Sequence, residues 1–326
     1  MNRLRRPSVV AMLLLLASLV AEAQQASKPS RIGWLAVSAG GSSTLAASFR
    51  DGLQQFGWVE GRDFTIEYRT ADGKVERLPT LAADLVRLKV DVIVALGEAA
   101  PAAAKKVTTA IPIVMTFGGD PVATGLIVSL PRPGGNVTGL ASMYPELSGK
   151  RLELLKQAVP SLRRAAVLWN RDNASHRPAL RASEEAARTL GIELHSVEFR
   201  TRQDFEPAFL AARQARAGAL LILDDPATFT HRELLVRLAS TEGLPAIYPY
   251  REAGEAGGFM AFGANLAAMS RHAAGYVDKI LKGAKPAELP VEQPTVFDLI
   301  INVKAAKALG IVIPPSLLLR ADRVIE

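Results

Sequence analysis

The feature that most constrains the fold is an order of strand-like runs that recurs in the two halves of the chain. Four short segments of the first half return in the second half in the same order and at nearly the same spacing. The matched segments are 66–70 with 197–201, 92–96 with 220–224, 111–114 with 244–247, and the glycine pairs 134–135 with 257–258. One such match arises by chance, but four in order favour two lobes of the same fold.

The strand-like runs also indicate how each lobe is built. Runs such as Val90–Leu96 and Ile111–Phe117 are apolar apart from Asp91 and Thr116, and helix-like segments lie between them. Strands of this kind are typical of a parallel sheet that helices cover on both faces. We therefore predict an α/β fold with one parallel sheet in each lobe.

A stretch rich in glycine and proline, residues 118–140, is expected to hold the first crossing between the lobes. Asp120-Pro121 stands at the end of a strand-like run, a short apolar helix-like segment follows, and Val137–Leu140 is the predicted hinge strand. We expect the first lobe to comprise residues 31–138 plus about 264–292. The second lobe would take residues 139–263 plus about 293–326, including an extended apolar C-terminal tail that staples the lobes together.

The first 23 residues have the pattern of a signal peptide. The segment begins with three positive residues, Arg3, Arg5 and Arg6. An apolar run follows at residues 9–20, which is too short for a comfortable membrane span, and residues 21–23 have a small-x-small cleavage pattern. An uncleaved N-terminal anchor is the alternative. Because the chain has no cysteine, a lipid anchor on cysteine and disulfides are both excluded. We expect a periplasmic protein that is exported and not lipid-anchored.

Charge and motifs argue against several classes of function. The net charge of +7 comes partly from the N-terminal arginines, and the remaining basic residues are interleaved with acidic ones. This pattern is typical of a solvated surface rather than a nucleic-acid site. The four histidines lack metal-ligand spacing, and no nucleophile elbow, Walker loop or dinucleotide fingerprint is present. We predict no metal, no cofactor and no enzymatic activity.

Candidate ligand-binding residues follow the strands, because ligands of open parallel sheets bind beyond the carboxyl ends of the strands. Hydroxyls, amides, carboxylates and aromatic rings stand there, a set that suits a small zwitterion or another polar organic ligand. The positions after the strands also include Glu98, Asn173, Ser175, Asp225 and Tyr250. The residues predicted to bind are Ser42, Ser43, Thr116, Asp120, Asn170, Asp224 and Tyr248.

Some of these residues have a structural alternative. Ser42 and Ser43 are also suited to capping the first helix. Asp120-Pro121 and the similar Asp225-Pro226 are ordinary turn dipeptides.

Long segments of the chain resemble the ABC-transporter substrate-binding proteins of the tryptophan/tyrosine type. The segments are FRDGLQQFGWVEGRDFTIEYRTADGKVERLPTLAADLVRLKVDVIVA, GGDPVATGLIVSLPRPGGNVTGL, GKRLELLKQAVP, GGFMAFGANL, LKGAKPAELPVEQPT, INVKAAKALGI and IPPSLLLRADRVIE. The resemblance spans essentially the whole mature chain. It implies a type I periplasmic-binding fold, in which two Rossmann-like lobes with parallel sheets are joined by a multi-strand hinge. The chain departs from many relatives in lacking the lipid-bearing cysteine.

Our leading hypothesis is the periplasmic solute-binding component of an ABC importer. It would act as a monomer, capture an amino acid or related carboxylate by lobe closure, and deliver it to a membrane permease. One alternative is a ligand-sensing periplasmic module that serves a sensor partner. A second is an exported group-transfer enzyme, although the nucleotide loop or paired carboxylates that it would need are not found.

Overall fold

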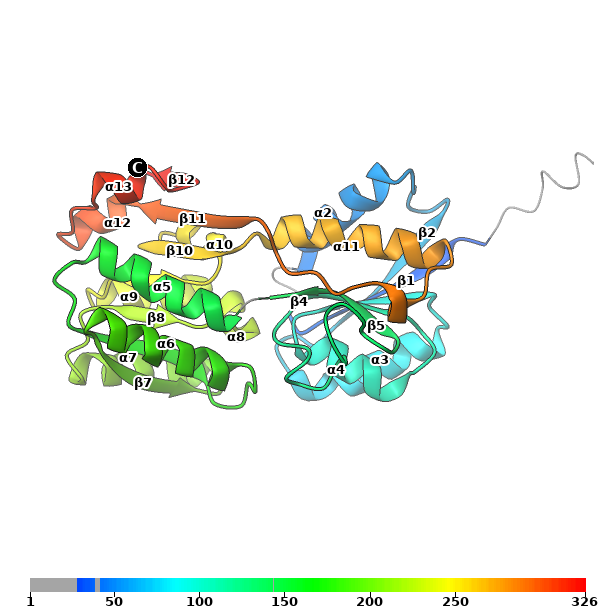
Figure 1. The fold of residues 1–326 in the computed structure, drawn as a ribbon, viewed down its shortest axis with the longest axis horizontal. Coiled ribbons are helices and arrows are strands. Elements are labelled where there is room, and N and C mark those ends of the chain that lie inside the picture. The colour runs from blue at the N-terminus through cyan, green and yellow to red at the C-terminus, as the bar shows by residue number, and fades with distance from the viewer. Residues whose placement is uncertain (1–27, 39–41, 143) are drawn as a thin grey trace, which may run out of the picture.

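The computed structural model describes residues 28–38, 42–142 and 144–326. The predicted signal peptide therefore lies outside the described residues. Figure 1 shows two lobes side by side, each built around its own sheet. In the described part of the chain, no helix is both long and apolar enough to cross a bilayer.

The first lobe contains a five-stranded sheet in which every paired neighbour is parallel, in the order β2-β1-β3-β4-β5. Its strands are β1 (Ser30–Ala36), β2 (Phe64–Thr70), β3 (Val92–Leu96), β4 (Ile113–Gly118) and β5 (Val137–Ala141). Its helices are α2 (Ser42–Gln55), η1 (Val75–Arg77), α3 (Leu78–Arg87) and α4 (Ala99–Val107). β5 contains both residues that flank the predicted lobe boundary, and it forms an edge of this sheet.

The second lobe contains a seven-stranded sheet in the order β12-β11-β10-β9-β8-β6-β7, in which β10 and β11 are the antiparallel pair. Its strands are β6 (Arg164–Asn170), β7 (Glu193–Phe199), β8 (Leu220–Ile222), β9 (Ala246–Tyr248), β10 (Met260–Ala264), β11 (Phe297–Asn302) and β12 (Arg323–Ile325). Its helical segments are α5 (Tyr144–Ala158), α6 (His176–Leu190), η2 (Arg202–Asp204), α7 (Phe205–Gln214), α8 (Pro226–Thr230), α9 (Arg232–Thr241), α10 (Arg251–Glu255), α12 (Val303–Ala308) and α13 (Pro315–Leu318).

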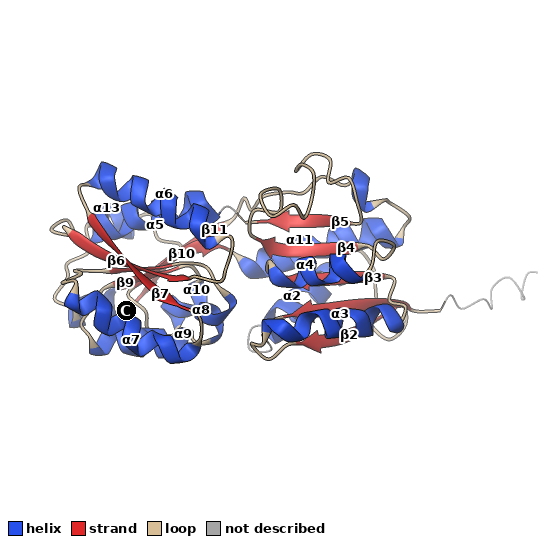
Figure 2. Cartoon of the chain, turned by 90° about the horizontal axis from the view of Figure 1, so that it is seen from below, coloured by secondary structure: helices blue, strands red, loops and turns tan. Residues whose placement is uncertain are grey.

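Both faces of each sheet are covered, which explains the continuous apolar runs of the sequence. In β1, Ile32, Trp34 and Ala36 pack into one cluster with α2. Leu35 and Val37, the residue after β1, pack into another cluster on the opposite face. The second sheet likewise separates two clusters. Figure 2 shows helices on both faces of each sheet. The predicted α/β architecture is confirmed, and the sheets are mostly parallel, with the antiparallel pair β10–β11 as the departure in the second lobe.

The chain passes between the lobes three times in the described residues. It leaves the first lobe after β5, returns between β10 and α11 (Leu266–Leu281), and leaves again between η3 (Pro286–Glu288) and β11. Although α11 follows the strands of the second lobe, it packs against α2, and the Ser270 hydroxyl donates to the Leu45 carbonyl at 2.7 Å. The last crossing runs beside β5, where the Ala141 amide donates to the Glu292 carbonyl at 2.9 Å.

Two local expectations were wrong. The predicted helix after Asp120 is a series of turns, because Asp120 Oδ1 accepts from the amides of Val122 and Ala123 and Gly125 takes a φ of +69° that ends a helical path. The C-terminal tail is not uniformly extended: Pro315 begins the short helix α13, which packs on the second lobe through Leu317.

Candidate functional site

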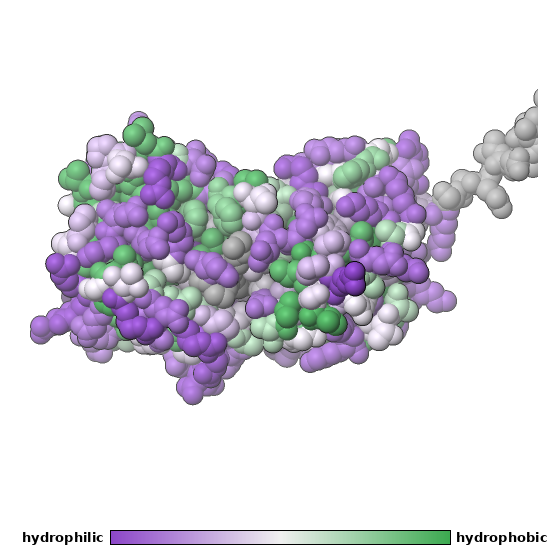
Figure 3. Space-filling model, viewed as in Figure 1, coloured by the Kyte–Doolittle hydropathy of each residue, from purple (hydrophilic) through white to green (hydrophobic). Residues whose placement is uncertain are grey.

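The carboxyl ends of strands from both sheets meet between the lobes. From the first lobe come Glu98, which follows β3, and Gly119, which follows β4. Ser175 comes from the second lobe, in the turn after β6. A Cβ atom added to Gly119 would lie 2.9 Å from Glu98 Oε2 and would overlap the Ser175 hydroxyl. The two lobes are thus in contact at Gly119, where any side chain would require Glu98 or Ser175 to shift. In Figure 3 the molecule narrows where the lobes meet.

Asp225 organises the second-lobe side of this site. Its Oδ2 atom accepts from the side-chain amides of Asn170 at 3.1 Å and Asn173 at 3.0 Å. Its Oδ1 atom accepts from the Ala227 amide at 2.8 Å and so caps α8. Asp225 is 4% exposed, so this carboxylate is held in one orientation by amide donors from two loops.

A buried histidine fixes the loop that carries Asn170. The backbone amide of Asn170 donates to Nδ1 of His176 at 2.7 Å. Because Nδ1 accepts, Nε2 holds the ring proton, and it donates to the backbone carbonyl of Asp224, also at 2.7 Å. His176 is 1% exposed. Through these two bonds His176 joins the end of β6 to the residues that follow β8.

Several polar atoms of the site are buried with few partners. Thr116 Oγ1 has no hydrogen bond to any described residue, and Glu98 and the Ser175 hydroxyl pair only with each other, across the contact between the lobes. Thr116 and Ser175 are 0% and 5% exposed. Buried polar atoms are normally fully paired, and leaving one unpaired costs about 1–3 kcal/mol. Polar atoms of both lobes with at most one partner at this contact are therefore suited to bonding a ligand.

Negative charge accumulates here. Burial raises the pKa of Glu98, the nearby Ser175 hydroxyl opposes the rise, and the charges of Asp225 and Asp120 add to it. Among the described residues, neither lysine nor arginine forms an ion pair with these three carboxylates. The site is therefore suited to a cationic group.

Aromatic rings of the second lobe also reach the first lobe. Phe229 and Tyr250 of the second lobe form an edge-to-face pair with ring centroids 4.9 Å apart. Both pack against the first-lobe cluster that contains Leu45 and Phe117. Phe117 has a φ of +43°, an unusual conformation for a residue with a side chain, at the end of β4. These rings would suit an apolar or aromatic part of a ligand.

The structure separates the seven predicted site residues into groups. Thr116, Asp120 and Asn170 lie at the meeting strand ends, although Asp120 also caps its own turn. Ser42 and Ser43 begin α2, and their side chains lie outside the description.

Asp224 and Tyr248 have other partners. Asp224 forms a two-pronged ion pair with Arg151, which is fully buried and also donates to the Phe262 carbonyl at 2.6 Å. Tyr248 lies in the second-lobe core, 2% exposed, with its hydroxyl 3.4 Å from the Leu235 carbonyl, and burial raises its pKa.

Four residues of the site were not among the predicted binders: Glu98, Gly119, Ser175 and Asp225. Three of them stand among the polar positions after the strands, so their location was visible in the sequence. Which of these positions are free to bind a ligand could not be read from the sequence, because that depends on which side chains already have a partner in the fold. Gly119 gave no signal, since its role depends on a residue 56 positions away.

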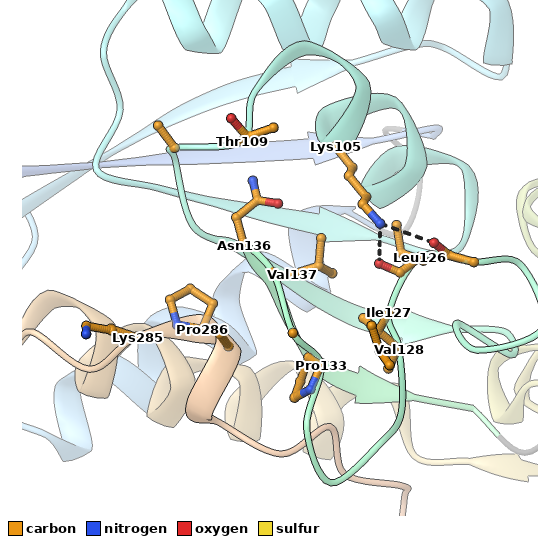
Figure 4. A pocket seen from close by; sticks show the side chains of 15 residues that line it. Lys105, Thr109, Leu126, Ile127, Val128, Pro133, Asn136, Val137, Lys285 and Pro286 are labelled. Atoms are coloured by element: carbon orange, nitrogen blue, oxygen red, sulfur yellow. Dashed lines mark hydrogen bonds between the residues drawn. The ribbon is translucent and has the colours of Figure 1, made fainter.

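A second hollow lies away from this site, on the first lobe. Its volume is about 490 Å³, and it is bordered by the loop before β5, the end of α4 and η3. Figure 4 shows that the Lys105 amine points to the Gly125 and Leu126 carbonyls, to which it donates at 3.1 and 2.8 Å. Because these bonds occupy the amine, the hollow offers a weaker ligand site than the contact between the lobes.

Two lobes that are joined by three chain crossings and bring buried polar groups together where they meet have the architecture of a two-lobed ligand-binding protein. A family model for ABC transporter substrate binding proteins matches residues 35–325. The chain belongs to this family.

Individual relatives support the assignment. The chain is 25% identical to a tyrosine-binding protein of Clostridioides difficile over 261 residues, which are 80% of this chain and 75% of that protein. It is 28% identical to a conserved domain protein of Vibrio cholerae, with a TM-score of 0.85, covering 91% of this chain and 100% of the other.

Two further solved structures differ in ligand state. The match to a Streptococcus pneumoniae ABC domain in complex with L-Trp has 23% identity, a TM-score of 0.85, and coverage of 91% and 100%. The match to the ligand-free, open structure of a substrate-binding protein from Clostridium difficile also has 23% identity, with a TM-score of 0.67 and coverage of 91% and 99%. Periplasmic binding proteins are also among the structural neighbours, so the type I periplasmic-binding fold is confirmed.

Proposed function

We propose that this protein captures an amino acid, preferably one with an aromatic side chain, between its lobes and delivers it to the permease of an ABC importer. The observation that carries the proposal is the contact of Glu98 and Gly119 with Ser175, where Glu98 and the Ser175 hydroxyl, buried groups of opposite lobes, have no partner but each other. A ligand that bonds both sides would favour the closed arrangement over the open one.

The parts of an amino acid match the surroundings of this contact. Glu98 and Asp225 would receive the ammonium group, and Thr116 and Ser175 would donate to the carboxylate or accept from the ammonium. Phe117, Phe229 and Tyr250 would contact the side chain. The tyrosine and tryptophan bound by the two relatives have the same three parts.

A binding screen tests the proposal. We expect tyrosine, tryptophan or phenylalanine to raise the melting temperature of residues 24–326, since a ligand at a hundred times its Kd adds about 2.7 kcal/mol. Titration calorimetry would then give one site per chain. Sugars and inorganic anions serve as negative controls. If every amino acid leaves the melting temperature unchanged, the proposal is wrong.

The location and partner follow from the same proposal. The chain would work in the periplasm as a monomer and would meet its permease at the outer face of the inner membrane. Co-purification of the amino-acid-loaded protein with a permease from the source membranes, and its loss without ligand, is the expected result.

A further inference from the structure

Carboxylates from both lobes lie around the contact between Gly119 and Ser175. Glu98 of the first lobe adjoins this contact, and Asp225 of the second lobe accepts from Asn173, two residues before Ser175. The charges of Asp225 and Asp120 both act on Glu98. Asp225 cannot turn away, because two amide side chains and the Ala227 amide hold it. Like charges in a region of low polarity repel strongly, so closing the lobes around empty space is unfavourable while both carboxylates are ionised.

The nearby cations of the protein do not relieve this repulsion. His176 Nε2 is 3.8 Å from Asp225 Oδ2, but its Nδ1 accepts a hydrogen bond and the ring is therefore neutral. Arg151 is committed to Asp224 and to the Phe262 carbonyl. On the helix that follows Glu98, the Lys105 amine is directed to the carbonyls of Gly125 and Leu126. Among the described residues, no lysine or arginine pairs with Glu98 or Asp225, so the positive charge would come from outside the protein.

We propose that Glu98 and Asp225 form an electrostatic interlock, which lets the lobes close only when a ligand ammonium group lies between them or a proton neutralises Glu98. The ligand half of this inference rests on the proposed function, whereas the proton half does not. The buried Ser175 hydroxyl, whose partner in the empty site is Glu98, is the third group that such an ammonium would bond.

The interlock makes closure depend on pH, because the surroundings of the Glu98 carboxyl differ between the open and the closed form. In the closed form, burial and the neighbouring charges of Asp225 and Asp120 raise the pKa of Glu98. In the open form water reaches Glu98, so its pKa returns toward the ordinary value. The closed form then binds the proton more tightly, and the empty protein closes as pH falls and opens as pH rises through the raised pKa.

The interlock also defines the ligand class. Amino acids and amines can supply the ammonium group, while deaminated acids of the same shape cannot. Phenylalanine and 3-phenylpropionate form a matched pair that differs in this group alone.

Distance measurements between two labels would test the interlock. The chain has no cysteine, so Lys74→Cys and Gln203→Cys place one label on each lobe, at exposed positions after β2 and β7. We expect the empty protein to be mainly open at neutral pH and to shift toward the closed distance in mild acid. Phenylalanine should close it at neutral pH, whereas 3-phenylpropionate should not.

The variant Glu98→Gln removes the charge and keeps the shape. The empty variant should be closed at neutral pH, should not respond to pH, and should lose about tenfold or more of its preference for phenylalanine over 3-phenylpropionate. Glu252→Gln is the matched control, because burial also raises the pKa of Glu252 but its charged neighbours all belong to the second lobe. This control should behave as the parent does.

The outcomes separate the two proposals. An empty Glu98→Gln protein that stays as open as the parent, with an unchanged pH response, overturns the interlock. If no amino acid closes the parent but the Glu98-dependent pH response is present, the proposed ligand is wrong and the interlock stands. Closure by 3-phenylpropionate as readily as by phenylalanine overturns the requirement for an ammonium group.

Discussion

At the scale of single residues, Gly119 sets how closely the lobes approach. An added methyl group would overlap Ser175 and lie 2.9 Å from Glu98. We therefore expect Gly119→Ala to hold the lobes apart, at a cost to closure of about 1–3 kcal/mol. Ligand affinity should fall roughly tenfold to a hundredfold, as measured by titration calorimetry.

Gly135→Ala provides the control for this prediction. Gly135 has nothing within 4 Å of an added Cβ and no left-handed backbone, so affinity should not change. Because open lobes tolerate both substitutions, the melting temperatures of the empty proteins should match that of the parent. Equal affinities of the two variants would show that Gly119 does not limit closure.

A second residue-scale prediction concerns the buried pair of Arg151 and Asp224. Arg151→Met leaves the Asp224 charge without a partner at 6% exposure, which should lower the free energy of unfolding by about 3–5 kcal/mol. Adding Asp224→Leu removes that charge and should restore much of the loss. Urea titrations of the single and double variants measure the difference. A double variant less stable than Arg151→Met would contradict this explanation.

At the scale of elements, the β4–β5 edge shapes the first-lobe side of the site. The register shifts between Met115 and Gly118, and this irregularity turns Phe117 to its positive φ. Gly139 in β5 makes the shift possible, because it has a φ of +121° and an added Cβ would lie 2.8 Å from the Met115 amide nitrogen. A side chain at this position would push β5 away from β4.

We expect Gly139→Ala to lower the free energy of unfolding by at least about 2 kcal/mol, since it adds a backbone clash to an unfavourable conformation. Gly125→Ala is the comparison, because Gly125 has a φ of +69° with open space around it. The free energy of unfolding of Gly125→Ala should fall only by the conformational cost, about 1–2 kcal/mol. Urea unfolding followed by circular dichroism measures both. Equal losses would mean that the close approach to Met115 does not matter.

The elements were predictable from the sequence to different degrees. Strands such as β3 and β4 are continuously apolar, and that pattern follows directly from burial on both faces. The turn after Asp120 was mistaken for a helix because its residues are apolar, while one capping carboxylate and Gly125 decide its path. The polar positions after the strands were also predictable. The sequence did not show which of them are available to a ligand, because Asp224, for example, is paired with Arg151, 73 residues away.

At the scale of the whole molecule, three crossings let the lobes move, and the contact between the Gly119 and Ser175 loops stops the movement. A Cβ added at Gly119 would lie 3.1 Å from Ser175 Cβ, slightly closer than the spacing of about 3.5–4.5 Å found in disulfides. Gly119→Cys with Ser175→Cys should therefore form a disulfide when the lobes close, and a small opening movement would relax it. The bond would join the lobes at the site itself.

Oxidation of this double variant should trap the closed form. Tyrosine or another ligand bound before oxidation should exchange at least about a hundredfold more slowly than from the reduced protein, because release requires the lobes to separate. Reductant should restore exchange, and the single Gly119→Cys variant should show no redox effect. Radiolabelled ligand and rapid filtration measure the rates. Fast exchange from the fully oxidised double variant would mean that the ligand leaves without separation of the lobes, and capture by lobe closure would then be the wrong mechanism.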